Sequence, residues 1–138
     1  MRGLAQKLGI KSGYNINLIG STPSEASIIR DSSPEGVTFL EEPSFSILDM
    51  IIFWPKTKSQ MTTEFFHLQD LIKPDGAIWV VIPKKKYASR AGINFSWDEL
   101  QTAALQTDLV DNKIASINEQ SYATRFVICK DRRNTYRK

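Results

Sequence analysis

Two nearly continuous apolar runs, residues 49–54 and 77–82, dominate the hydrophobic pattern of this chain. A strand that is covered on both faces shows such a run, whereas a strand with one exposed face alternates apolar and polar residues. Between the runs, an apolar stripe at helical spacing predicts a helix over residues 60–72, for which Ser59 is the expected N-cap. The sequence Pro-Asp-Gly at 74–76 should form the turn that ends this helix. The stripe consists of Met61, Phe65, Leu68 and Ile72.

The first part of the chain alternates between shorter strand and helix signals. Residues 15–20 are mostly apolar and predict a first strand, and residues 37–40 predict a short second one. Between them, Thr22 fits the N-cap of a helix over residues 23–30, where a proline takes the first helical position and Glu25 the reciprocal capping position. This strand–helix–strand order is typical of a parallel sheet whose helices connect neighbouring strands.

After the second apolar run the pattern turns basic and then helical again. Residues 84–95 contain lysines, an arginine and a glycine, and we expect them to form a loop. Ser96 opens a capping box for a helix that should end near Gln106. Residues 109–117 predict a fifth strand with a polar centre, and residues 122–129 alternate as an antiparallel partner at the sheet edge.

Strands that alternate with helices, two of them continuously apolar, predict an α/β fold. We expect a three-layer, Rossmann-like architecture: a mostly parallel sheet of about six strands between helices, with an antiparallel C-terminal edge hairpin. Residues 1–130 are expected to form a single domain, and the basic residues 131–138 a disordered tail.

Composition narrows the class of protein without identifying a function. The chain has 138 residues, of which 41% are hydrophobic and 24% charged, as in ordinary globular domains. No apolar run approaches the roughly 20 residues of a membrane span, and the N-terminus lacks an apolar signal core, so we expect a cytoplasmic protein without membrane contact. The single cysteine, Cys129, excludes an intramolecular disulfide. A net charge of +3 permits an anionic partner without requiring one.

The order of the predicted elements, together with the turn at residues 71–76, resembles the S-adenosylmethionine-dependent methyltransferases. In that family a leucine-lysine-proline-glycine-glycine turn precedes an apolar strand, and here Leu-Ile-Lys-Pro-Asp-Gly precedes residues 77–82. The resemblance implies a methyltransferase-like topology.

A narrower resemblance covers nearly the whole chain. It rests on Lys-Leu-Gly-Ile-Lys-Ser-Gly-Tyr at 7–14, on Pro-Asp-Gly-Ala-Ile-Trp at 74–79 with Pro-Lys-Lys at 83–85, and on Leu-Val-Asp-Asn-Lys at 109–113 with Arg-Phe-Val at 125–127. These segments resemble a family of small bacterial domains of unknown function that look like trimmed methyltransferases. That family has a second tryptophan before its proline-lysine-lysine step, where Ile82 stands here. It has no established catalytic residue, so none is carried over.

The methyltransferase resemblance implies a cofactor site at the first turn of the sheet. A glycine-rich turn after the first strand lets the backbone approach S-adenosylmethionine, and an acid at the end of the second strand binds the ribose hydroxyls. The candidate residues here are Gly20, Ser21, Thr22 and Glu41. The turn has a single glycine followed by a proline, and Glu25 in the first helical turn opposes an anionic guest. We therefore expect a vestigial site, with S-adenosylmethionine binding as the alternative.

Basic side chains follow the two apolar runs, at the edge where open α/β sheets bind ligands. They are Lys56, Lys84, Lys85, Lys86 and Arg90. Charge-assisted hydrogen bonds from this rim could hold a phosphate or an acidic peptide. A solvated loop that keeps a hydrophobic strand soluble is the competing interpretation. Nucleic-acid binding would want interleaved aromatic side chains, and the basic C-terminus offers only Tyr136.

The residue types that carry most enzymatic chemistry are scarce. His67 is the sole histidine and falls on the polar side of its predicted helix, so we expect no triad, no zinc site and no catalytic residue. Cys129 lies in the last predicted strand and lacks a second histidine to activate it. The tryptophans Trp54, Trp79 and Trp97 are expected to pack in the core rather than to stack on a ligand.

The sequence favours a non-catalytic module that binds a small anionic ligand or a protein on a degenerate methyltransferase-like fold. One alternative is a methyltransferase with an atypical cofactor loop. Another is a weak nucleotide or nucleic-acid binder that uses Lys84, Lys85, Lys86 and Arg90. Exposed edges at the second strand or the terminal hairpin leave homodimer formation open.

Overall fold

The computed structural model describes residues 4–20, 23–40, 48–55, 57–84, 87, 97–107, 109–117 and 121–128. The strands are β1 (Asn15–Ile19), β2 (Thr38–Leu40), β3 (Leu48–Phe53), β4 (Ile72–Pro83), β5 (Leu109–Ser116) and β6 (Ser121–Ile128). The helices are α1 (Leu4–Leu8), α2 (Pro23–Ser32), α3 (Lys58–Leu68) and α5 (Trp97–Leu105), and a 3-10 turn, η1 (Gln69–Leu71), follows α3. The predicted basic loop lies mostly, and the predicted C-terminal tail entirely, outside the described residues.

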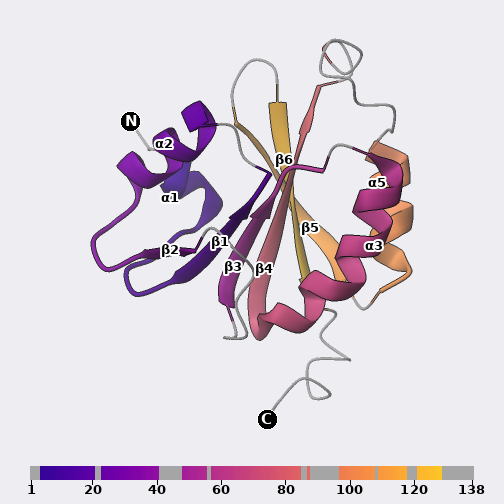
Figure 1. Cartoon of the computed structure of the whole chain (residues 1–138), viewed down its shortest axis with the longest axis horizontal. Coiled ribbons are helices and arrows are strands. Elements are labelled where there is room, and N and C mark those ends of the chain that lie inside the picture. Colours follow the sequence, from indigo (N-terminus) through magenta and orange to yellow (C-terminus); the bar gives the residue numbers. More distant parts are fainter. Residues whose placement is uncertain are drawn as a thin grey trace.

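The described strands form one sheet in the order β2-β1-β3-β4-β6-β5 (Figure 1). β1 pairs in parallel with β2 and β3, and β3 pairs in parallel with β4. β6 is antiparallel to both β4 and β5, so it alone among the described strands runs against the others. The chain moves outward from β1 to β2 and then returns to the other side of β1 at β3. This mostly parallel, Rossmann-like sheet with a C-terminal hairpin confirms the predicted fold class.

Helices cover both faces of the sheet, and each face has its own core (Figure 1). α1 and α2 cover one face, with Leu8 and Ile29 among their buried residues, and α3 and α5 cover the other. The two cores meet different sides of the same strands: Met50 of β3 belongs to the first core, and Ile51 to the second. Both faces of β3 and β4 are therefore buried, which explains why their sequences are apolar throughout.

The end of α3 differs from the prediction. The helix ends at Leu68, and β4 already begins at Ile72, so the Pro-Asp-Gly segment lies inside the strand and not in a turn before it. Leu48 pairs with Ile72 and Met50 with Ala77, so residues 73–76 of β4 face one residue of β3. This segment is an irregular, bulge-like interruption of the pairing, which tolerates a proline because backbone groups there are released from the ladder.

Two further predictions are wrong: the residue that caps α3 and the position of the last strand in the sheet. Thr57, and not Ser59, caps α3, because the helix starts at Lys58 and the Thr57 hydroxyl accepts a hydrogen bond from the Gln60 N–H at 3.0 Å. The last strand is not at the edge of the sheet: β6 lies between β4 and β5. The physical reason is burial, because Phe126 and Ile128 of β6 are fully buried whereas the centre of β5 is exposed and polar.

None of the helices in the described ranges is long and apolar enough to cross a membrane.

Candidate functional site

The carboxyl edge of the sheet, where β1, β3 and β4 end, is the usual ligand edge of such folds. The chain reverses its direction of travel across the sheet between β1 and β3, so a crevice is expected where these two strands end. The Trp54 N–H donates a hydrogen bond to the Ile19 carbonyl at 2.9 Å, one residue beyond the end of β3. The two strand ends therefore remain paired at this point.

The Trp54 side chain connects the end of β3 to the first turn of α2. Trp54 as a whole is 7% exposed, and its Nε1–H donates to Oε2 of Glu25 at 2.7 Å. Glu25 thus places a half-buried negative charge near the N-terminus of α2, where an anionic ligand group would otherwise be favoured. The charge of this carboxylate therefore opposes an anionic ligand group at this position.

Gly20 allows this close contact between the two strand ends. Its φ of +79° is a conformation that residues with a side chain rarely adopt, and a Cβ at this position would lie 2.8 Å from the Trp54 carbonyl oxygen. Gly20 is therefore needed for the contact between the end of β1 and Trp54, whether or not the turn after it binds a ligand.

The structure describes only part of the predicted site at this edge. Gly20 follows β1, as expected, whereas the other predicted cofactor residues, Ser21, Thr22 and Glu41, lie outside the described residues. Of the predicted anion-binding residues, the half-buried Lys84 directly follows β4, and the Lys84 carbonyl accepts a 2.8 Å hydrogen bond from the Tyr87 N–H. β3 lies between β1 and β4, so Gly20 and Lys84 are not on adjacent strands. Lys56, Lys85, Lys86 and Arg90 lie outside the described residues.

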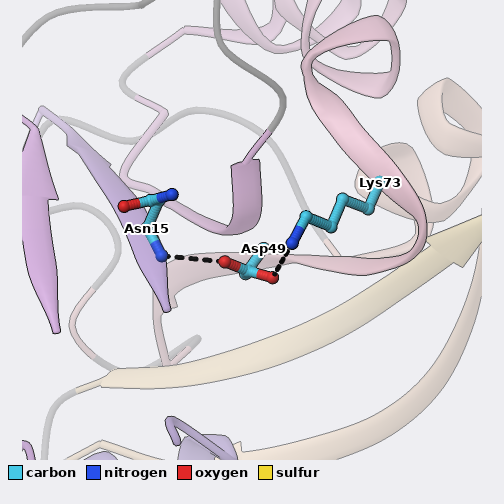
Figure 2. Close-up of polar contacts among 3 residues, drawn as sticks. All are labelled: Asn15, Asp49 and Lys73. Carbon is cyan, nitrogen blue, oxygen red and sulfur yellow. Dashed lines mark hydrogen bonds and ion pairs between the residues drawn. The ribbon is translucent and has the colours of Figure 1, made fainter. Parts of the chain in front are cut away.

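At the opposite edge, which we call the amino edge, one carboxylate links the beginnings of three adjacent strands. Asp49 of β3 accepts a hydrogen bond from the Asn15 N–H at the start of β1, at 2.8 Å, on one oxygen. Its other oxygen forms a 2.8 Å ion pair with Nζ of Lys73 near the start of β4 (Figure 2). The Asp49 side chain is 13% exposed and the Lys73 side chain 46%. The hydrogen bond and the negative charge of Asp49 raise the pKa of Lys73 above its ordinary value.

A cavity of about 270 Å³ opens beside Asp49 on the sheet face that α1 covers, and we call it the amino-edge pocket. Its apolar wall consists of Leu8, Met50, Ala77 and Trp79, and its polar wall of Lys11, Tyr14, Asp49, Asp75, Lys113 and Arg125. Four of the five segments that carry the narrower family resemblance contribute to it: 7–14, 74–79, 109–113 and 125–127.

The sequence predicted binding residues only at the carboxyl edge, so this pocket was not anticipated. Two signals were available. Asp49 is the one charged residue in the first apolar run, and Lys113 and Arg125 lie on two strands that were expected to pair as a hairpin. The register of that hairpin, which places Lys113 directly opposite Arg125, could not be read from the sequence.

The structure describes most of the remaining candidate residues. His67 is exposed on α3, and the described residues contain no group of three or more side chains suited to a metal ion. Trp54 and Trp79 are buried, and the half-buried Trp97 donates a 3.0 Å hydrogen bond to the hydroxyl of the buried Thr124. The tryptophans are therefore part of the cores, as expected, although Trp79 also forms a wall of the amino-edge pocket. Cys129 lies outside the described residues.

No protein-family model matches the chain, and no curated protein sequence matches it. Several solved structures do match the chain. A SAM-dependent methyltransferase from Aquifex aeolicus has a TM-score of 0.62 at 12% identity, covering 92% of this chain and 90% of that one. A ribosomal protein L11 methylase from Lactobacillus delbrueckii subsp. bulgaricus has a TM-score of 0.63 at 6% identity, covering 91% and 74%. The N-methyltransferase NodS from Bradyrhizobium japonicum WM9, in complex with S-adenosyl-L-homocysteine, has a TM-score of 0.57 at 13% identity, covering 91% and 82%.

These matches show a methyltransferase-like fold over most of the chain. The predicted likeness to a trimmed methyltransferase is therefore confirmed for the fold. At 6–13% identity, the matches carry no residue role over to this chain.

Proposed function

We propose that this protein is a non-catalytic module that binds a small anionic ligand on a methyltransferase-like fold. The observation that carries the proposal is the bridge across the carboxyl edge, from the end of β1 through Trp54 to Glu25 of α2. In a methyltransferase this edge must admit the cofactor. Here the Trp54 backbone pairs with β1, and its indole is fixed against an acidic residue whose charge opposes an anionic group at the N-terminus of α2.

The alternative is an S-adenosylmethionine-dependent methyltransferase with an atypical cofactor loop. It is favoured by the fold and by NodS, a structural neighbour that contains S-adenosyl-L-homocysteine. In this alternative, Gly20 and the turn that follows it would hold the methionine part of the cofactor, and the cofactor would supply the methyl group.

Isothermal titration calorimetry with S-adenosylmethionine and S-adenosylhomocysteine decides between the two functions. Under the proposal, neither compound gives a saturable heat at concentrations up to about 1 mM, which corresponds to a binding free energy weaker than about −4 kcal/mol. NodS, measured under the same conditions, is the positive control for ligand quality. One-to-one binding of either compound with a micromolar Kd would overturn the proposal in favour of the methyltransferase.

Glu25→Gln tests the physical reason for the expected result. The amide oxygen can still accept the Trp54 Nε1–H, but the negative charge is gone. Glu35→Gln, which removes an exposed acid beyond α2, is the matched control. A gain of S-adenosylhomocysteine affinity in the Glu25 variant alone supports electrostatic exclusion from this edge. An equal gain in both variants contradicts it.

A further inference from the structure

The residues that line the amino-edge pocket carry more positive than negative charge. Three cations, Lys11, Lys113 and Arg125, and two acids, Asp49 and Asp75, line it. Asp49 is neutralised by Lys73 from outside the lining, which leaves three positive charges against one negative. Within the described part of the chain, no carboxylate forms an ion pair with any of the three lining cations.

Without a bound anion, the positions of Lys113 and Arg125 are unfavourable for the stability of the sheet. The two residues lie directly opposite each other on the antiparallel strands β5 and β6. Like charges in this arrangement destabilise a sheet, because their side chains share one face at close range. Arg125 is also half-buried, and a guanidinium withdrawn from water without an anionic partner costs free energy. Both costs would be offset by an anion bound between the two side chains.

The apolar wall of the pocket is buried and is tied to α1 by a hydrogen bond. Trp79 is 1% exposed, and its Nε1–H donates to the carbonyl of Leu8 at 2.9 Å, which ties β4 to the end of α1. Met50 and Ala77 of the apolar wall are also buried. The polar end of the Trp79 indole is thus already satisfied, so the indole offers a ligand no additional donor.

The size of the pocket limits the ligand. Its 270 Å³ lies just below the roughly 300–1,000 Å³ of sites for drug-sized ligands. The volume suits a compound with a single ring or a short aliphatic chain and excludes complete enclosure of a dinucleotide.

We propose that the amino-edge pocket binds a small organic anion, with its carboxylate or phosphate between Lys113 and Arg125 and its apolar body against Trp79. Arg125 suits this role because the planar guanidinium donates two parallel hydrogen bonds to either anionic group. Lys11 adds long-range attraction at the rim. The inference rests on the proposed function in requiring a small anionic ligand, and it assigns the site and the chemical class of that ligand.

Four probes on the full-length chain test this assignment by calorimetry: phenyl phosphate, phenylacetate, inorganic phosphate and phenethylamine. Phenyl phosphate or phenylacetate should bind more tightly than inorganic phosphate, which lacks the apolar body, and than phenethylamine, which carries the opposite charge. The tighter of the two aromatic anions identifies the head group as phosphate or carboxylate. Binding should weaken as salt is added, because ions screen partly exposed charges. If neither aromatic anion binds more tightly than phenethylamine, the inference is overturned.

Lys113→Gln and Arg125→Gln locate the bound anion. Each variant should weaken binding of the better aromatic anion by about ten- to a hundredfold, the usual effect of losing a charged hydrogen bond. Lys7→Gln, which removes an exposed lysine of α1 that does not line the pocket, should leave the affinity unchanged. Without ligand, Lys113→Gln should be at least as stable as the wild type, since it removes a like-charge contact.

The outcomes distinguish this inference from the proposed function. Undiminished affinity in both Lys113→Gln and Arg125→Gln would place the anion elsewhere and overturn the inference, while the proposed function would stand. Micromolar binding of S-adenosylhomocysteine would overturn the proposed function without bearing on these two side chains. Loss of stability in Lys113→Gln together with unchanged anion affinity would identify a merely structural lysine. A shift of the Trp79 indole N–H signal in the NMR spectrum on adding ligand would support the assignment independently.

Discussion

Gly20 and Gly13 have the same unusual backbone conformation but different surroundings. Their φ angles are +79° and +85°, yet a Cβ on Gly20 would lie 2.8 Å from the Trp54 carbonyl oxygen, whereas nothing lies within 4 Å of a Cβ on Gly13. Gly13→Ala should therefore cost only the conformational penalty of about 1–2 kcal/mol. Gly20→Ala should cost that amount plus about 1–3 kcal/mol of steric strain. Urea denaturation of both variants measures the difference.

The pair of substitutions separates packing from backbone strain. If the two alanine variants unfold at the same urea concentration with the same slope, the strand ends at the carboxyl edge are not in tight contact, and the support for a bridged edge is lost. A larger loss for Gly20→Ala supports the bridge from β1 to Trp54.

Single residues were predictable where the local sequence determines their environment. His67 follows from helical periodicity alone, because its position on α3 is opposite the buried stripe. The partner of Glu25 was not predictable, because Trp54 lies 29 residues further along the chain. The pairing of Lys113 with Arg125, and the free energy that it costs the sheet, were not predictable either. The register of a hairpin depends on residues in its turn as well as on its strands.

α3 and the hairpin strand β6 meet through an aromatic pair. The rings of Phe65 and Phe126 are 5.3 Å apart in an edge-to-face arrangement, and both side chains are fully buried. Phe126→Ala should lower the free energy of unfolding by about 3–5 kcal/mol, because it removes this contact and leaves a cavity between helix and sheet. Leu105→Ala, at a position that is 58% exposed on α5, should change it by less than about 0.5 kcal/mol. Equal effects of the two substitutions would contradict the observed packing of α3 on β6.

The element types were predicted better than their boundaries. Apolar runs identified β3 and β4 because both faces of these strands are covered. The start of β4 was missed because Ile72 continues the helical stripe of α3 in sequence while its backbone already pairs with Leu48. Pro-Asp-Gly normally marks a turn, and only the pairing of the flanking residues identifies it here as a bulge within a strand.

Stability in alkaline solution should reflect two raised pKa values. The pKa of Lys73 lies above its ordinary 10.5 because of the hydrogen bond and the charge of Asp49, and the pKa of Tyr122 lies above its ordinary 10.0 because of burial and the charge of Asp98. In both cases the unfolded chain releases its proton at a lower pH than the folded chain. The stability that these groups contribute is therefore present below about pH 10 and is lost as the pH rises through the folded pKa values.

Urea denaturation between about pH 9 and about pH 11.5 tests this expectation. The free energy of unfolding should fall over this range in the wild type and fall less steeply in Lys73→Met and in Tyr122→Phe. Lys7→Met, which removes an exposed lysine of α1, should retain the slope of the wild type. An unchanged slope in both Lys73→Met and Tyr122→Phe would show that neither group contributes to the alkaline loss.

The overall architecture was predictable because it follows from the order of apolar and amphipathic segments. The site was not predictable in the same way. The bridge at the carboxyl edge joins residues 20, 25 and 54, and the amino-edge pocket joins segments that begin at Leu8 and end at Arg125. Such contacts are determined by the packed sheet as a whole, so a chain can match the methyltransferase fold while its ligand edge differs.

The central position of β4 has a consequence during synthesis of the chain. β4 is apolar on both faces, and one of its long sides pairs with β6, which leaves the ribosome after β4 because it lies further along the chain. Until residues 121–128 emerge, the nascent chain carries an uncovered, hydrophobic strand side that can pair with another chain. Pairing with β6 therefore covers a side of β4 that could otherwise pair with another chain, and a chain that stops before β6 would lack this cover.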